Sequence, residues 1–154
     1  MGCKTMDTVT YPHEEVADFI QKNFIAVKIP RHELLEQIYR VPWTPTILIL
    51  DPDGRERCRE VGYLPPEDFL AHMNLALGRA DFDDKDFSSA ASFFQTVVDQ
   101  HKTSETVPEA LYFLGLSRSK MTGGTNDDRR AIWKQLMEVY PKSDWAKKVS
   151  VYFA

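Results

Sequence analysis

The feature that most constrains the fold is an uncharged apolar run in the first half of the chain. The run Thr46-Ile47-Leu48-Ile49-Leu50 is rich in β-branched side chains, which is typical of a strand buried on both faces. The turn Asp51-Pro52-Asp53-Gly54 follows directly, with a proline that presets φ and a glycine that accepts a positive φ. The sequence therefore predicts a buried strand that leads into a hairpin.

Helical and extended patterns alternate around this hairpin. Apolar residues at helical spacing and short apolar runs predict four helices and two further strands. The predicted helices cover residues 3–9, 14–24, 34–39 and 66–78, and the predicted strands cover residues 24–29 and 57–61. Charged side chains in the 57–61 segment mark it as an edge strand, because charges oppose further strand pairing. This order of elements predicts an α/β fold for the first half.

Two short motifs lie about 40 residues apart in these structural contexts. Cys3-Lys4-Thr5-Met6 opens the first predicted helix, and Thr44-Pro45-Thr46 leads into the buried strand. The pair resembles the thioredoxin-like family, in which a C-x-x-C-K-x-M site opens a helix and faces a cis-proline. The resemblance covers residues 3–79. It implies a thiol–disulfide oxidoreductase that acts on protein substrates.

The resemblance also implies roles for individual residues. Cys3 would be the second, resolving cysteine, and its position at a helix start beside Lys4 favours the thiolate. Pro45 would be the cis-proline that leaves the backbone of Thr44 open to pair with an extended substrate. Trp43 would line the substrate groove or simply pack. The alternatives are an inert cysteine in an incomplete motif and a trans proline that begins a strand.

The family pattern predicts that this chain is truncated at its N-terminus. In C-x-x-C-K-x-M the first cysteine would fall one position before Met1, and two strands and a helix of the family would also precede it. The predicted strand at residues 24–29 has then lost its usual neighbours. Since unpaired buried backbone groups are costly, two alternatives remain: the strand pairs directly with Thr46–Leu50, or the chain is a fragment of a longer protein.

The second half of the chain reads as helical throughout. It carries three amphipathic stripes. The first maps onto the third at an offset of 39 residues, so that Phe94 corresponds to Trp133, and Ser104 corresponds to Ser143 at the same offset. The segment resembles tetratricopeptide repeats. The residues that carry this resemblance are Leu77, Gly78, Phe87, Ala90 and Phe94 in one unit, and Leu114, Gly115, Trp133 and Pro141 in a second. We therefore expect a thioredoxin-like domain at residues 1–79 and a helical repeat region at residues 80–154.

Composition excludes several classes of function. The net charge is −4 and no Lys/Arg cluster is present, which argues against nucleic-acid binding. No apolar stretch approaches the roughly 18 residues of a membrane helix. The first twenty residues contain no apolar signal segment, which slightly favours the cytoplasm, although an export signal could have been lost upstream.

The cysteines and histidines give no metal-site pattern. Cys3 and Cys58 lie 55 positions apart and the four histidines are scattered, so we expect no metal and no cofactor. Alternation in the edge strand places Cys58 on the face opposite its arginine neighbours, as a packed small hydrophobe.

The sequence leaves two functions open. In the first, a partial thioredoxin-like α/β fold that lacks its first two strands catalyses thiol–disulfide exchange, and all-α tetratricopeptide-like hairpins hold a protein partner or substrate. In the second, the thioredoxin-like part is a redox-inactive scaffold, and the protein is an interaction adaptor.

Overall fold

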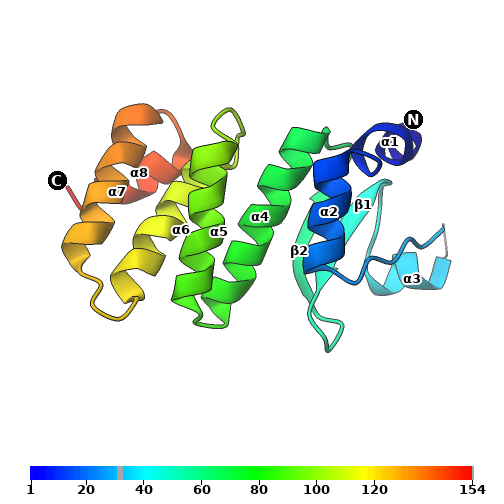
Figure 1. Cartoon of the computed structure of the whole chain (residues 1–154), viewed down its shortest axis with the longest axis horizontal. Coiled ribbons are helices and arrows are strands. Elements are labelled where there is room, and N and C mark those ends of the chain that lie inside the picture. The colour runs from blue at the N-terminus through cyan, green and yellow to red at the C-terminus, as the bar shows by residue number, and fades with distance from the viewer. Residues whose placement is uncertain (31–32, 154) are drawn as a thin grey trace. The chain divides into compact units, whose positions relative to one another are not determined.

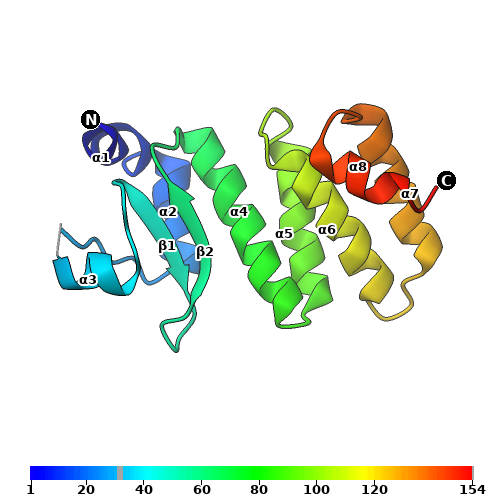
Figure 2. The same ribbon diagram turned by 180° about the vertical axis from the view of Figure 1, so that it is seen from behind.

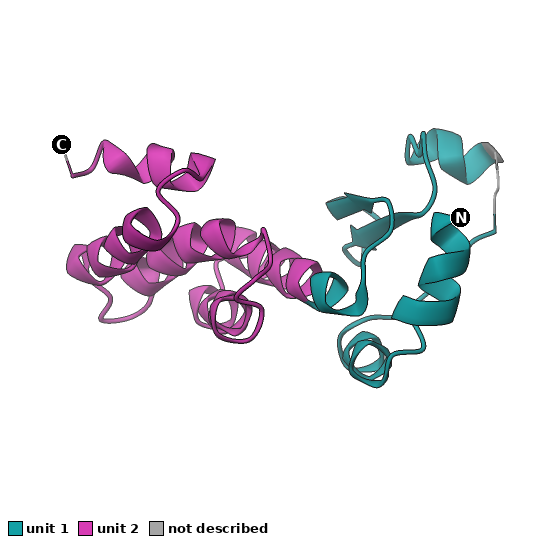
Figure 3. Cartoon of the chain, turned by 90° about the horizontal axis from the view of Figure 1, so that it is seen from above, with its two compact units in different colours: residues 1–70 teal, residues 71–154 magenta. Residues whose placement is uncertain are grey.

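The computed structural model describes residues 1–30 and 33–153 (Figure 1). The chain divides into two compact units, Met1–Leu70 and Ala71–Ala154 (Figure 3). The fold is mixed α/β in the first unit and helical in the second. Helix α4 (Pro66–Asp83) begins in the first unit and ends in the second.

The first unit begins with a short helix that is pinned to the segment before α4. Helix α1 (Gly2–Thr5) runs directly into a π-helical turn, η1 (Met6–Thr10). The Thr10 hydroxyl donates a 2.6 Å hydrogen bond to the Leu64 carbonyl, and the Leu64 amide points at the Met6 sulfur at 3.5 Å. Met6 and Thr10 are both fully buried. These contacts fix the helix that carries Cys3.

Two further helices of this unit match their predicted positions. Helix α2 (Glu14–Asn23) carries acids in its first turn and buries Val16, and α3 (Glu33–Ile38) follows it. Acids at a helix N-terminus are favoured by the helix dipole, which agrees with the sequence signal.

The predicted hairpin is confirmed. Strands β1 (Thr46–Leu50) and β2 (Glu56–Val61) pair antiparallel, with Leu48 opposite Arg59 and Ile49 opposite Cys58 (Figure 2). In the turn, the Asp51 carboxylate accepts hydrogen bonds from the amides of Asp53 and Arg55. Gly54 has a φ of 78°, which glycine adopts without a steric cost.

The predicted strand at residues 24–29 is wrong. These residues form no ladder, and among the described residues the sheet consists of β1 and β2 alone. The alternative in which they pair directly with β1 is wrong for the same reason. Ile25, Val27 and Ile29 are 97%, 74% and 53% exposed, so a row of β-branched side chains lies open. Composition favours a strand here, but a strand also requires a neighbour to hydrogen-bond.

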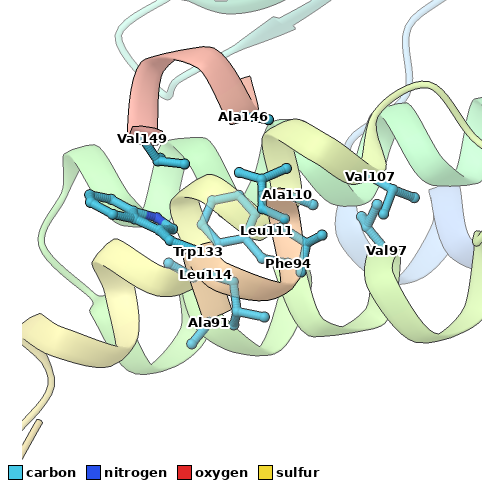
Figure 4. Packing of buried hydrophobic residues seen from close by; sticks show 12 residues of the cluster. Ala91, Phe94, Val97, Val107, Ala110, Leu111, Leu114, Trp133, Ala146 and Val149 are labelled. Carbon is cyan, nitrogen blue, oxygen red and sulfur yellow. The ribbon is translucent and has the colours of Figure 1, made fainter. Parts of the chain in front are cut away.

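Helices make up the second unit, and their predicted stripes pack into one core (Figure 4). After α4, the chain forms four more helices: α5 (Phe87–Gln100), α6 (Val107–Lys120), α7 (Asn126–Val139) and α8 (Asp144–Ser150). Phe94, Leu111, Trp133 and Leu136 are at most 1% exposed. The indole of Trp133 donates a 3.0 Å hydrogen bond to the Tyr112 carbonyl, which satisfies its buried N–H.

Side-chain caps begin three of these helices. Asp86 accepts from the Ser89 amide, Ser143 accepts from the Ala146 amide, and Thr125 forms a reciprocal capping box with Asp128. The caps explain why each helix starts where it does.

Helix α4 is longer than predicted. The expected end at Gly78 is wrong, because the helix continues to Asp83. A Cβ on Gly78 would lie 2.7 Å from a ring carbon of Phe94. The glycine therefore makes room for an aromatic ring and does not end the helix.

Candidate functional site

The thiol of Cys3 lies on a helix that the fold holds in place. Cys3 belongs to α1, its side chain is exposed, and its sulfur is a free thiol. Lys4 follows it in the last turn of α1. An exposed thiol is open to a substrate from solution, and the buried Met6 and Thr10 keep its helix fixed.

Gly2, the residue before Cys3, packs directly against Pro45. A Cβ on Gly2 would lie 2.8 Å from Cδ of Pro45 and 3.8 Å from Cβ of Tyr63. Any larger residue would collide with the proline ring. The backbone that leads into Cys3 therefore lies against the Thr44–Pro45 segment, although the two motifs are distant in sequence.

The segment around Pro45 is anchored on both sides. The Pro45 carbonyl accepts a 2.8 Å hydrogen bond from the Gly62 amide, and the Thr46 hydroxyl donates a 2.6 Å bond to the Trp43 carbonyl. The Thr44–Pro45 peptide bond is cis. These bonds tie the segment to the start of β1 and the end of β2.

A hollow of about 360 Å³ opens beside this segment. The residues that line it are Met1, Glu36, Val41, Pro42, Trp43 and Thr44. Trp43 is 69% exposed, which is unusual for so large an aromatic residue. The hollow lies in the first unit, and it contains both residues that the sequence assigned to substrate binding.

The electrostatic neighbourhood of Cys3 includes Tyr11. Burial raises the pKa of the Tyr11 phenol, and the negative charges of Asp7 and of the Cys3 thiolate raise it further. Asp7 in turn accepts a 2.6 Å ion-pair contact from Lys28. The Tyr11 ring also packs edge-on against Phe69, with centroids 6.1 Å apart. The phenol therefore stays neutral beside the thiol at physiological pH.

Cys58 occupies a different environment. It lies on β2 opposite Ile49, is half-buried, and has its sulfur 3.9 Å from a carboxylate oxygen of Glu60. It forms no disulfide with Cys3, since both thiols are free. The predicted role of Cys58 as a packed small hydrophobe stays a prediction, because the thiol is only half-buried and contacts a carboxylate.

Sequence reasoning missed several residues of this site. Gly2 was not singled out, because a glycine beside a cysteine carries no local signal that it touches a proline far along the chain. The same holds for Glu36, Val41 and Pro42 on the wall of the hollow. The structure brings Trp43 and Thr44 into the hollow and places Pro45 against the neighbour of Cys3.

The described residues give no sign of two other kinds of site. Within residues 1–30 and 33–153, no three His, Cys, Asp or Glu side chains form a metal-binding group. In the same part of the chain, every helix is too short or too polar to span a bilayer.

Comparison with protein-family models decides the family. The model of a thioredoxin-like domain matches residues 1–77, half of the chain. The chain belongs to the thioredoxin-like domain family. Comparisons with curated proteins and with solved structures gave no match.

The thioredoxin-like match includes every element of the candidate site. It begins before Cys3, contains the hairpin and the hollow, and ends within α4. Helices α5 to α8 lie outside it. The family match therefore bears on the chemistry of the thioredoxin-like domain and not on the role of helices α5 to α8.

Proposed function

We propose that this thioredoxin-like domain catalyses thiol–disulfide exchange on protein substrates through Cys3. The observation that carries the proposal is the contact between Gly2 and Pro45. This contact places the backbone next to Cys3, whose thiol is exposed, against the segment that borders the hollow. An accessible thiol, a fixed helix and an adjoining cleft are what exchange with a folded or extended polypeptide requires.

The proposed reaction of residues 1–154 is one-thiol exchange and starts with the Cys3 thiolate. With a partner cysteine three positions before it, Cys3 would instead resolve the mixed disulfide, the role that the family resemblance implies. The thiolate attacks one sulfur of a substrate disulfide, a Cys3–substrate disulfide forms, and the other substrate sulfur leaves as a thiolate. A second thiolate, from glutathione or another protein, then attacks the substrate sulfur and releases Cys3. One disulfide and one thiolate are consumed and one of each is produced, so no external oxidant or reductant is needed.

The residues of the hollow would hold the substrate during this exchange. Pro45 would shape the groove, the backbone of Thr44 would pair with an extended substrate strand, and Trp43 would pack on its side chains. Main-chain pairing of this kind gives affinity without a strict sequence requirement, which suits an enzyme for varied proteins.

The test compares two cysteine variants of the same chain. The substrate is a fluorescent peptide as its symmetric disulfide dimer, and the readout is the rate at which reduced glutathione at pH 7.5 converts it to peptide thiol and peptide–glutathione disulfide. Cys3→Ser should reduce the rate to the uncatalysed background, and Cys58→Ser should keep it within about twofold of the parent. Equal activity of the parent and Cys3→Ser would show that Cys3 does not carry the reaction.

We also propose that the functional polypeptide contains a partner cysteine and further strands upstream of Met1. The C-x-x-C-K-x-M pattern supports the cysteine. The exposed row Ile25, Val27 and Ile29 supports the strands, as does β1, which carries no charged side chain and, among the described residues, pairs only with β2. The upstream reading frame tests this: any residue other than cysteine immediately before Met1 contradicts it.

For the helical region, we propose two tetratricopeptide-like hairpins that hold a protein partner. Equivalent glycines support the repeat. Gly78 faces Phe94 and Gly115 faces Trp133, each with 2.7 Å between the position of a Cβ and the nearest ring atom. Each pair joins the first helix of a hairpin to the second. The two rings lie 39 positions apart and the two glycines 37, so the turn of the second hairpin holds two extra residues.

This repeated contact also favours the second candidate function, a non-catalytic adaptor. In that case the helical region binds a partner and the thioredoxin-like part is a scaffold. A complementation assay separates the two, because an adaptor keeps its biological activity as Cys3→Ser whereas an exchange enzyme loses it.

A further inference from the structure

We propose that the hollow beside Trp43 selects substrates that carry lysine or arginine next to the reactive cysteine. This inference rests on the proposed exchange function and names the substrate class of the same site. Three observations support it: the nature of the walls, the carboxylate on one of them, and the charge of the unit that contains them.

The walls suit a long side chain with a positive end. Val41 and Pro42 give an apolar surface, against which the methylene stem of lysine or arginine can pack. Trp43 lines the same hollow and is largely exposed. Tryptophan is the aromatic residue that attracts a cation most strongly through its ring face.

A carboxylate lies on the same wall. Glu36 is half-buried in α3 and lines the hollow together with Trp43. A carboxylate can accept more than one hydrogen bond, and the guanidinium of arginine matches it in shape. The hollow therefore offers an apolar stem site, an aromatic face and an anionic group within one space.

The charge of the chain is concentrated on the unit that contains the hollow. Residues 1–70 hold twelve Asp/Glu against eight Lys/Arg, whereas residues 71–154 hold eleven of each. The whole net charge of −4 thus belongs to the thioredoxin-like unit. A negative unit attracts basic substrates and disfavours acidic ones, most strongly at low ionic strength.

The volume fits a single side chain with surrounding space. At about 360 Å³ the hollow lies at the small end of the range for ligand sites. This volume is enough for an arginine side chain at one position of the substrate.

The experiment uses three peptides that differ only in the residue before their cysteine: arginine, leucine or glutamate. Each peptide is used as its symmetric disulfide dimer with reduced glutathione as the second thiol, and kcat/KM is measured with the parent chain. The arginine peptide should exceed the glutamate peptide by about tenfold, with leucine between them. Glu36→Gln and Trp43→Leu should each reduce this ratio to about threefold or less.

Glu14→Gln is the matched control, since it makes the same change of charge on α2 of the same unit and outside the lining of the hollow. Its arginine-to-glutamate ratio should equal that of the parent. If Glu14→Gln lowers the ratio as much as Glu36→Gln, only the overall charge matters and the hollow is not the selecting site. Equal rates for all three peptides would also overturn the inference.

A binding measurement separates this inference from the proposed function. The same peptides, with serine in place of cysteine, are titrated by calorimetry. One outcome would contradict the exchange function but support the selection of basic substrates by the hollow. In it, the chain exchanges no disulfide but still binds the arginine peptide better than the glutamate peptide, and Glu36→Gln removes that preference. If exchange occurs without any preference in rate or binding, the result supports the exchange function and contradicts the selection of basic substrates by the hollow.

Discussion

Gly2 lies against Pro45 so closely that a Cβ on Gly2 would be 2.8 Å from Cδ of the proline. The contact spans more than forty positions of sequence and lies entirely in the thioredoxin-like unit. Real Cβ atoms do not approach a heavy atom this closely, and a proline ring cannot rotate away as a flexible side chain would. The backbone before Cys3 and the segment before β1 are therefore fitted to each other.

Replacing Gly2 tests this fit. Gly2→Ala should lower the free energy of unfolding by about 1–3 kcal/mol, the usual cost of overpacking a tight contact. It should also slow exchange, because the helix that carries Cys3 must shift. Chemical denaturation measures the first effect and the glutathione exchange assay the second.

A double variant identifies the cause. If the clash with the ring is responsible, the losses of Gly2→Ala and Pro45→Ala together should be smaller than their sum. Simple additivity would mean that Gly2 matters for a reason other than Pro45.

For two glycines of the helical unit, helix propensity and steric contact predict opposite changes in stability on replacement by alanine. Gly78→Ala and Gly115→Ala would each gain about 1 kcal/mol if helix propensity decided the outcome. Each new Cβ would instead meet a buried ring, that of Phe94 or Trp133, at 2.7 Å. We expect both variants to be destabilised by about 1–3 kcal/mol in chemical denaturation.

An exposed helix position serves as the control for these variants. Ser88→Ala on α5 changes propensity without a buried contact and should stay within about 0.5 kcal/mol of the parent. Stabilisation by either glycine replacement would contradict the ring contacts and weaken the case for the repeat.

The capping box of α7 predicts a dependence of stability on pH. Hydrogen bonds from the Thr125 hydroxyl and amide lower the pKa of the Asp128 carboxyl below its ordinary value. Because the folded pKa is depressed, the stabilisation is present above the unfolded pKa and is lost as pH falls through the folded pKa. The midpoint of thermal unfolding should therefore decrease below about pH 4.

Asp128→Asn should lower the melting temperature at pH 7 and make its decline at acid pH smaller. Asp127→Asn, one residue earlier in the same helix turn, should follow the profile of the parent more closely. Identical profiles for Asp128→Asn and the parent would mean that the capping box contributes nothing to the stability.

The local part of the fold could be predicted from sequence, and the non-local part could not. The β1–β2 hairpin was predictable because a proline, a glycine and an apolar run lie together in the chain. The helices of the second unit were predictable because their apolar residues repeat at helical spacing. In each case the signal and the structure occupy the same residues.

The errors come from interactions with distant residues. Residues 24–29 have the composition of a strand, but a strand forms only where a neighbour completes its hydrogen bonds. Gly78 looked like a helix end because the sequence does not show that Phe94 lies over it. The hollow beside Trp43 was predictable only in part, since Glu36 and Val41 enter it through tertiary folding.

The most direct test of the account is to trap the intermediate that it requires. The chain is incubated with an excess of the arginine peptide as its symmetric disulfide dimer without reduced glutathione, quenched in acid, digested, and examined by mass spectrometry. We predict that the peptide is attached to Cys3 by a disulfide and that Cys58 remains a free thiol. Attachment at Cys58, or no attached peptide while exchange still proceeds, would contradict the account.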